Sequence, residues 1–476
     1  MSAGLISGCS KLRAGRMQRA VMLAASISMA MAQSASFAQA DDKGKGPAII
    51  RDAEVEALLA DYTRPILKAA GVNAGAVKVF IINDRSFNAF VADGRKIFIN
   101  TGALMEAKTP NELIGVLAHE TGHMAGGHLV RLHQELARAQ VLAVAGMLLG
   151  GAAAVTSMRN GGRGAVGSDS TGVMGAVLGP GELVRRSLLS YVRSEEQSAD
   201  RAAVKYLDAT NQSSKGLLTT LQRFENDQLF MSAQIDPYLQ SHPLPRERIA
   251  SLETAAKASP SFEVKDSAAL QARHDLMRAK LFGFVGTAGE VARRYPLADQ
   301  SVAAKYARAV TAFRFGRIDD AVAQIDALIA LQPNNPYFYE LKGQTLLEGN
   351  RAAAAISPLR KAMALAPEGI PIRVLLGHAL ISTNSQKDAD EAVLVLSNAV
   401  QRDSDSAEAY SYLAMAWDKK GNIPQTQLAA AQALFEEGKY QEARTQAARA
   451  QKTFAVGTPG WLKADDILNY RPPKFD

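Results

Sequence analysis

The chain has 476 residues, a length that predicts two or three domains and a sizeable hydrophobic core. Apolar residues make up 47% of the composition and charged residues 21%, which excludes a disordered chain and a protein that crosses a membrane many times. The formal net charge is +7, but residues 1–40 hold four basic residues and no acidic one. Beyond them 50 basic residues face 47 acidic ones, so the charge gives little support for nucleic-acid binding.

The first 40 residues are typical of an export signal. Basic residues up to Arg19 precede the apolar run Ala20–Ala32, and Ala38-Gln39-Ala40 then supplies the small residues of a cleavage site. The apolar run is shorter than the roughly 20 residues that span a bilayer, so we predict a signal peptide over 1–40. Cys9 is the only cysteine, and its removal with the signal would leave a chain without disulfides or thiolate metal ligands.

The rest of the chain divides into segments that differ in residue composition and in the spacing of apolar residues. Helical spacing, interrupted by the strand-like runs Val77–Ile82 and Ile97–Ile99, predicts a mixed, mostly helical first domain. We predict a signal peptide over 1–40, a first domain over 41–255, a linker over 256–285, a repeat domain over 286–456 and a tail over 457–476.

Within the first domain, apolar spacing predicts helices over Ile49–Gly71 and from Glu112 to about Ala139, and another helix that begins near Glu182. The stretch Val141–Met158 contains no charged residue, and it precedes the Gly-rich run Asn160–Gly181. Two interpretations of the uncharged stretch remain open: a weak membrane-spanning segment, or a buried hairpin that covers the site.

Regularly spaced proline and small residues predict tetratricopeptide repeats from about Ala304 onward. Pro333 and Pro367 lie 34 residues apart, and each follows small residues at the same two distances. Small residues let two helices pack closely, and proline ends the second helix. About four repeats fit this spacing, and stacked repeats form a concave surface suited to extended polypeptides or partner proteins.

The clearest chemical signature is His119-Glu120-Thr121-Gly122-His123, the HExxH arrangement of zinc-dependent proteases. At about 100° per residue, His119 and His123 lie on one face of a helix, one turn apart, so both imidazoles can reach one ion. Glu120 projects beside that ion, where its carboxylate can take a proton from the attacking water. The sequence therefore predicts one zinc ion per chain, bound by these two histidines.

A catalytic zinc site needs a third protein ligand and one open position. Two nearby histidines are poor candidates if the helix continues. His128 then lies on the far side from His119, and His133 lies about 21 Å along the axis at a rise of 1.5 Å per residue. Neither is expected to share the ion.

A later helix offers better candidates for the third ligand. Glu196 and Asp200 are four residues apart and share a helix face, so Glu196 can bind the ion while Asp200 orients a ligand histidine through its ring N–H. Glu195 is adjacent to Glu196, and spacing alone leaves both glutamates open.

The run from Glu196 to Arg201, some 70 residues after HExxH, resembles the gluzincin family of HtpX and the CAAX prenyl endopeptidases. The resemblance covers about residues 50–255. It implies Glu196 as the third zinc ligand and Asp200 behind a ligand histidine. It also implies a gluzincin-type zinc protease domain with a small sheet. Together with the repeats that the spacing predicts, the chain is expected to have an α+β, mostly α fold, in which this domain is followed by an α-solenoid of tetratricopeptide repeats.

Two further site elements follow from the same resemblance. Asn88, Ala89 and Phe90 resemble the edge strand to which a peptide substrate adds as an extra strand. His242-Pro243 is shared with the periplasmic BepA branch of the family, in which the histidine approaches the zinc. This implies that His242 is a catalytic residue, which either stabilises the oxyanion or occupies the fourth zinc position.

These features predict a periplasmic zinc metalloendopeptidase that cleaves unfolded or misassembled proteins in the quality control of outer-membrane proteins. The repeats would bind unfolded polypeptides or the outer-membrane assembly machinery, with peripheral membrane contact and no nucleic acid. An alternative is a repeat-based periplasmic chaperone or adaptor with little proteolysis. A further alternative is a membrane-integrated protease that uses Val141–Met158 as its span.

Overall fold

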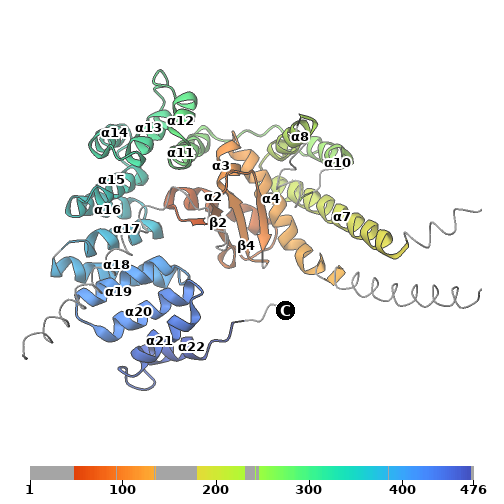
Figure 1. Cartoon of the computed structure of the whole chain (residues 1–476). Helices are drawn as coiled ribbons and strands as arrows, with labels where there is room; N and C mark the ends of the chain where they lie inside the picture. Colours follow the sequence, from red (N-terminus) through yellow and green to blue (C-terminus); the bar gives the residue numbers. More distant parts are fainter. Residues whose placement is uncertain are drawn as a thin grey trace, which may run out of the picture. The chain divides into compact units, whose positions relative to one another are not determined.

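The structure is a computed structural model that describes residues 48–135, 179–230, 242 and 246–472, apart from positions 93, 133 and 384. For residues 179–189 and 227–230 the description covers the backbone alone. The predicted signal segment 1–40, the uncharged stretch 141–158 and most of the Gly-rich run lie outside the described residues. The chain divides into two compact units, one over Pro47–Leu281 and one that contains Phe282–Asp476 (Figure 1).

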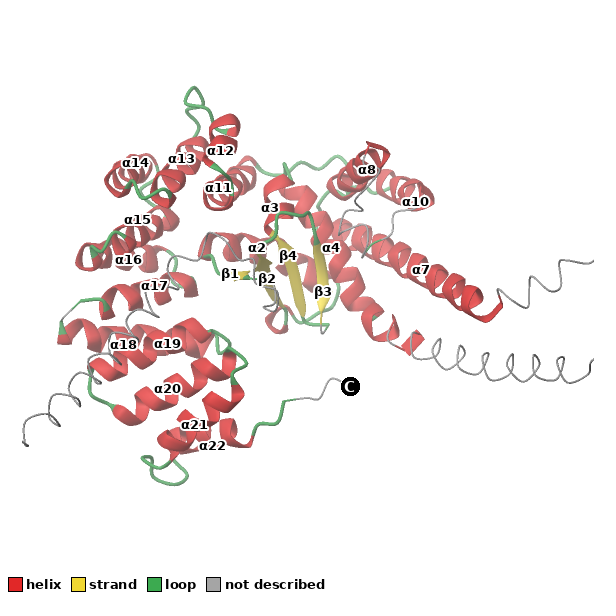
Figure 2. Ribbon diagram, in the orientation of Figure 1, coloured by secondary structure: helices red, strands yellow, loops and turns green. Residues whose placement is uncertain are grey.

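The first unit is built on a sheet of four short strands (Figure 2). The strands run in the spatial order β1-β2-β4-β3; β2 and β4 are parallel, whereas β1 and β3 are antiparallel to their neighbours. Their bounds are β1 (Ile49–Ile50), β2 (Lys78–Ile82), β3 (Ala89–Ala92) and β4 (Lys96–Asn100). Because side chains alternate along a strand, one face buries aliphatic residues, namely Ile81, Ala89, Ile97 and Ile99. On the other face Phe98 stacks between Phe80 and Phe90, with ring centroids 5.2 Å apart in each pair.

Helices cover this sheet. Helices α2 and α4 pack against strands and against each other, and α7 and α8 pack on α4. The helices of this unit are α2 (Ala53–Ala69), the 3-10 turn η1 (Ala74–Ala76), α3 (Thr101–Glu106), α4 (Pro110–Gly126), α7 (Gly179–Ala209), α8 (Lys215–Phe230) and α10 (Arg246–Lys257), followed by α11 (Ala268–Val285).

Two predicted helices begin or end elsewhere in the structure. The helix predicted over Ile49–Gly71 begins at Ala53, since the Asp52 side chain accepts a hydrogen bond from the backbone N–H of Val55 and caps it. The two isoleucines before it form β1 instead. The helix predicted from Glu112 to about Ala139 stops at Gly126, because Gly127 adopts φ +66°, a left-handed conformation that ends a helix. A separate helical stretch follows over 128–132.

The segment predicted as a linker contains the end of α10 and the helix α11. The first part of α11 is tied to the rest of the first unit by buried polar contacts. The imidazole of His274 lies 3.1 Å from the hydroxyl of Tyr62 and 2.9 Å from the carbonyl oxygen of Ala107. The ammonium of Lys280 lies 2.7 Å from a carboxylate oxygen of Asp52. The division between the two units falls inside α11, after Leu281.

The second unit contains helices that pack in consecutive pairs. They are α12 (Ala288–Arg294), α13 (Val302–Arg314), α14 (Ile318–Leu331), α15 (Pro336–Glu348), α16 (Ala352–Leu365), α17 (Ile370–Ile381), α18 (Gln386–Arg402), α19 (Ala407–Lys419), α20 (Ile423–Glu436), α21 (Tyr440–Gln451) and α22 (Pro459–Asn469). Small residues sit where these helices touch: a Cβ at Gly343 would collide with Leu359 of the next helix. Pro333 and Pro367 follow the ends of α14 and α16. The prediction of a mostly helical chain with a small sheet and a helical repeat region is confirmed.

Among the described residues no helix combines the length and the apolar character needed to cross a membrane.

Candidate metal centre

Helix α4 carries the HExxH residues through the interior of the first unit. Thr109 caps the helix by accepting a hydrogen bond from the backbone N–H of Glu112, and Pro110 occupies the first turn. Every residue of α4 from Leu113 to Gly122 is buried. His119 and Glu120 are therefore almost fully removed from solvent, at 0% and 1% exposure.

Helix α7 passes so close to α4 that the crossing point needs glycine. A Cβ on Gly122 would lie 2.9 Å from the carbonyl oxygen of Ala199, closer than such atoms approach in real structures. The crossing brings Glu196 and Asp200, which lie one turn apart on α7, against the two histidines of α4.

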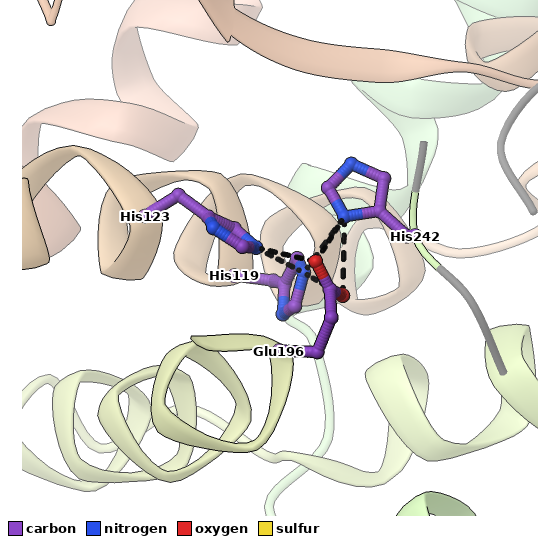
Figure 3. A group of neighbouring side chains, drawn as sticks. All are labelled: His119, His123, Glu196 and His242. Atoms are coloured by element: carbon purple, nitrogen blue, oxygen red, sulfur yellow. Dashed lines mark hydrogen bonds and ion pairs between the residues drawn. The ribbon is translucent and has the colours of Figure 1, made fainter. Parts of the chain in front are cut away.

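Four side chains from three segments meet at one point (Figure 3). One ligand atom from each of His119, His123, Glu196 and His242 lies within 4.8 Å of all the others. The Nε2 atoms of the two α4 histidines are 3.0 Å apart, and the Glu196 carboxylate lies 3.4 Å from His119 Nε2 and 3.2 Å from His123 Nε2. The Nδ1 of His242 lies 3.1 Å from Glu196 Oε1 and 3.4 Å from His119 Nε2.

Two groups hold this cluster from behind. Asp200 Oδ1 lies 3.0 Å from His119 Nδ1, so His119 directs its Nε2 into the cluster. The guanidinium of Arg248, on α10, donates from Nε and Nη2 to the Asp200 carboxylate at 2.7 and 2.9 Å, and its Nη1 lies 2.6 Å from Glu196. Arg248 is 1% exposed, so one buried cation fixes both carboxylates.

The electrostatics of the cluster favour a cation at its centre. Burial by itself lowers the pKa of His119, but hydrogen bonds to Asp200 and Glu196 outweigh it and raise that pKa to about 9. Burial lowers the pKa of His123 to about 3. Burial would raise the pKa of Glu196, yet hydrogen bonds from the three histidines hold it below its ordinary range. The site therefore stabilises one positive charge beside an ionised carboxylate and a neutral imidazole.

The donor set fits a zinc ion. Two imidazoles and one carboxylate are the protein ligands of one common class of catalytic zinc site. Their ligand atoms converge in a buried space, where a divalent cation can take the place of the proton and bind all of them. Glu120 is not among the converging ligand atoms; its Oε1 lies 3.4 Å from His242 Nε2, beside the cluster. Burial raises the pKa of the Glu120 carboxyl.

The remaining candidates occupy other places. Glu195, the alternative to Glu196, points away from the cluster, and its Oε2 lies 2.7 Å from both His128 Nε2 and Arg131 Nη2. His128 is not on the far side of α4, as a continuous helix would require, since the left-handed conformation of Gly127 interrupts the helix before it. His133 lies outside the described residues.

Sequence reasoning missed two residues of this region. Arg248 was not singled out, because a single arginine in a helical stretch shows no metal-ligand pattern. His128 was set aside because the helix was extended through Gly126 and Gly127. A Gly-Gly pair after a helical run is a common stop signal, and it would have warned against that extension.

The residues predicted for the substrate strand lie beside the cluster. Ala89 and Phe90 belong to β3, which is at one edge of the sheet and, among the described residues, pairs only with β4. Asn88 precedes β3, and its carbonyl oxygen accepts a hydrogen bond from the backbone N–H of Asn100. A cavity of about 540 Å³ extends from the metal cluster to this strand, lined mainly by apolar side chains that include Phe90, Met124 and Tyr191.

The peptidase-like first part of the chain and its repeat region both match known proteins. Residues 51–256 match Peptidase family M48, and residues 306–370 match a tetratricopeptide repeat. The chain is 24% identical over 413 residues to the Beta-barrel assembly-enhancing protease of Escherichia coli (strain K12), which covers 84% of this chain and 80% of that protein. It is 24% identical over 339 residues to the protein of the same name in Yersinia pestis, covering 68% and 65%.

A third relative is the Putative beta-barrel assembly-enhancing protease of Vibrio cholerae, 25% identical over 272 residues, which covers 55% of this chain and 52% of that protein. The two family matches and these relatives confirm the resemblance that the motifs indicate, namely a BepA-like peptidase with C-terminal tetratricopeptide repeats. They also confirm the order of its parts, a peptidase domain followed by repeats.

Proposed function

We propose, from the match of residues 51–256 to Peptidase family M48 and the tetratricopeptide repeat match that follows it, that the protein is an exported zinc endopeptidase of outer-membrane protein quality control. The observation that carries this proposal is the buried convergence of His119, His123 and Glu196, with Glu120 beside them. Each of these groups has the chemistry that hydrolysis of a peptide bond requires.

The zinc ion is bound by His119, His123 and Glu196 in this proposal. When bound there, zinc would supply Lewis acidity for activating water at neutral pH and for polarising the scissile carbonyl. Asp200 keeps His119 oriented through its Nδ1, and the buried guanidinium of Arg248 pairs with both Asp200 and Glu196.

Glu120 is the general base. Its carboxylate takes a proton from the attacking water and afterwards passes that proton to the leaving amine. Burial supports this role, because it raises the pKa of Glu120 and so makes the carboxylate a stronger base.

His242 occupies the fourth position of the metal cluster in the proposal. The support is geometric: its Nδ1 lies 3.1 Å and 3.2 Å from the two carboxylate oxygens of Glu196 and 3.4 Å from His119 Nε2. A histidine at that position holds the enzyme at low basal activity until substrate displaces it. We expect H242A to cleave substrate at the wild-type rate or faster, whereas a deep loss of activity would favour the oxyanion-stabilising role.

The substrates are unfolded or misassembled polypeptides. An extended peptide adds to the edge strand β3, at Asn88, Ala89 and Phe90, and directs its apolar side chains into the cavity beside it. Folded proteins bury both their backbone hydrogen-bonding groups and their apolar side chains, so this mode of binding selects clients that have lost or not yet gained their fold.

The site of action is the periplasm. The signal-like segment over 1–40 supports export, and relatives named for the enhancement of β-barrel assembly support a role with outer-membrane proteins, which are β-barrels. The repeats supply the surface for unfolded clients or for the outer-membrane assembly machinery.

The proposal is tested with purified protein that begins at Asp41. We expect it to bind one zinc ion per chain and to cleave unfolded casein, and we expect E120Q to bind zinc without cleaving. Equal cleavage by E120Q would refute the assignment of the base. Wild-type protein that suppresses aggregation of unfolded clients but cleaves none of them would favour the chaperone or adaptor alternative. Zinc content of E196A then tests the third ligand, since this variant should lose the ion.

A further inference from the structure

The end of helix α4 is shaped to return one imidazole to the site. Gly127 has φ +66°, which stops the helix, and the next residue, His128, is 5% exposed. A Cβ on Gly126 would collide with the ring of His128. Two adjacent glycines therefore allow the ring to fold back over the last turn of α4, which a continuous helix would prevent.

His128 touches the rear of a ligand rather than the metal cluster itself. Its Nδ1 lies 2.9 Å from Nδ1 of His123, the ring nitrogen that faces away from the cluster. Its other nitrogen, Nε2, lies 2.7 Å from Oε2 of Glu195. The same carboxylate oxygen accepts a hydrogen bond from Arg131 at 2.7 Å. These contacts form a chain from the protein surface to the second histidine of HExxH.

The order of protons along this chain follows from chemistry. A histidine that binds a metal through Nε2 carries its proton on Nδ1. The Nδ1–H of His123 then donates to Nδ1 of His128, which places the proton of His128 on Nε2, and that N–H donates to the Glu195 carboxylate. Each N–H has one acceptor, so the chain fits a neutral His123 that presents its Nε2 lone pair to the cluster.

We propose that His128 and Glu195 are positioning residues, which hold the ring of His123 in the orientation that binds zinc. This inference rests on the proposed function, because it assigns a role toward the same ion. It gives the second HExxH histidine the support that Asp200 gives the first, where Asp200 Oδ1 lies 3.0 Å from His119 Nδ1. The two ligand histidines of α4 thus have separate anchors, one a carboxylate alone and one an imidazole backed by a carboxylate.

The test compares zinc affinity across variants of the chain that begins at Asp41, measured by competition with a chelating dye. H128L removes the acceptor for His123 Nδ1–H and should weaken zinc binding by about 10- to 100-fold, the range typical for groups that orient a metal ligand. H128N keeps an acceptor oxygen near the position of Nδ1 and should recover much of that loss. In the Co²⁺-substituted protein, H128L should change the visible absorption spectrum, because the ligand field depends on the orientation of His123.

A matched control separates positioning from simple loss of a buried histidine. His274 is buried in the same unit and also uses both ring nitrogens, but it contacts Tyr62 and Ala107, away from the metal cluster. We expect H274L to lower thermal stability and to leave zinc affinity and the Co²⁺ spectrum unchanged.

Glu195 gives a second variant if H128L does not fold. Glu195 lies nearer the surface, at 15% side-chain exposure, and E195A should weaken zinc binding in the same direction but less than H128L. Wild-type zinc affinity in folded H128L or in E195A would overturn this inference and leave the proposed function intact. A wild-type chain that binds no zinc would overturn both.

Discussion

The same two-point ion-pair geometry occurs in the buried interior of the peptidase unit and on the surface of the repeat unit. Arg248 donates from Nε and Nη2 to the two oxygens of Asp200, at 2.7 and 2.9 Å, with both side chains 5% exposed or less. Arg360 donates in the same way to Glu391, at 2.9 and 2.5 Å, but these side chains are 46% and 28% exposed. The same ion-pair contacts therefore affect stability differently when they are buried and when they are exposed to water.

The two units use charge for different purposes. The repeat unit has a core rich in alanine and leucine, and its exposed ion pairs link different helices on the outside, such as Arg360 of α16 and Glu391 of α18. The peptidase unit places charges inside, where a missing partner leaves an ion without water or a counter-charge. We infer that the repeats are stabilised by close apolar packing and the metal centre by complete pairing of buried ions, and four changes test this contrast.

The largest effect is expected from R248M. The substitution leaves the carboxylates of Asp200 and Glu196 buried without their cation, and breaking such a pair destabilises a protein by about 3–5 kcal/mol. Urea unfolding followed by hydrogen exchange in α4 measures this change in the peptidase unit alone. Zinc content should fall as well. Wild-type stability in R248M would mean that water or the metal replaces the guanidinium, which contradicts the contrast.

A pH-dependent effect comes next. Burial lowers the pKa of His274 to about 4, against an ordinary value of about 6.5 in the unfolded chain. Between these values the unfolded chain binds a proton that the folded chain does not, so stability falls as the pH drops from about 6.5 to about 4. The full loss is about 3 kcal/mol. H274Q should flatten this dependence, measured as the difference between variant and wild type across that range. His378 of the repeat unit is only half-buried, and H378Q should change the dependence less.

A smaller effect is expected where apolar packing dominates. G343A adds one methyl group at the contact with Leu359, and overpacking of this kind destabilises by about 1–3 kcal/mol. G289A is the matched control, because a Cβ there meets nothing closer than 3.6 Å and should leave stability equal or slightly higher. Thermal unfolding of both variants, read in peptides of α15 and α16 by hydrogen exchange, checks the difference. Equal stability of G343A and G289A would show that the repeat core accommodates an added methyl group at little cost.

The smallest effect is expected from R360M, the surface counterpart of R248M. Exposed pairs contribute below about 1 kcal/mol, and added salt should reduce even that. The measurement is the same urea unfolding, at low and high salt. A loss as large as that of R248M would remove the distinction between the two units.

Local pattern predicted much of this fold and site. Helical spacing placed His119 and His123 on one face, and the 34-residue spacing of Pro333 and Pro367 marked the repeats. These features depend on neighbours within a few turns, which the sequence displays directly. The strand edges were less visible, since Ile49 and Ile50 read equally well as the start of a helix until their pairing with β2 is seen.

The features that were missed depend on contacts far apart in the chain or on one backbone angle. Arg248 meets Asp200 across 48 positions, and no local signal distinguishes it from a solvated arginine. His128 required the left-handed conformation of Gly127, and one residue of continued helix sends its ring to the opposite side. Sequence spacing describes a helix well, but it does not describe where the helix stops unless the stop signal is weighed against it.

The glycine at position 122 changes how the HExxH pattern should be understood. The pattern allows any residue at its third and fourth positions, so a search with it would accept any residue there. In this chain α7 crosses α4 at the fourth position of the pattern, and even a methyl group there would clash with the carbonyl oxygen of Ala199. A bulkier residue would preserve every ligand yet push Glu196 away from the two histidines. The absence of a Cβ atom at position 122 is therefore part of what allows this centre to form.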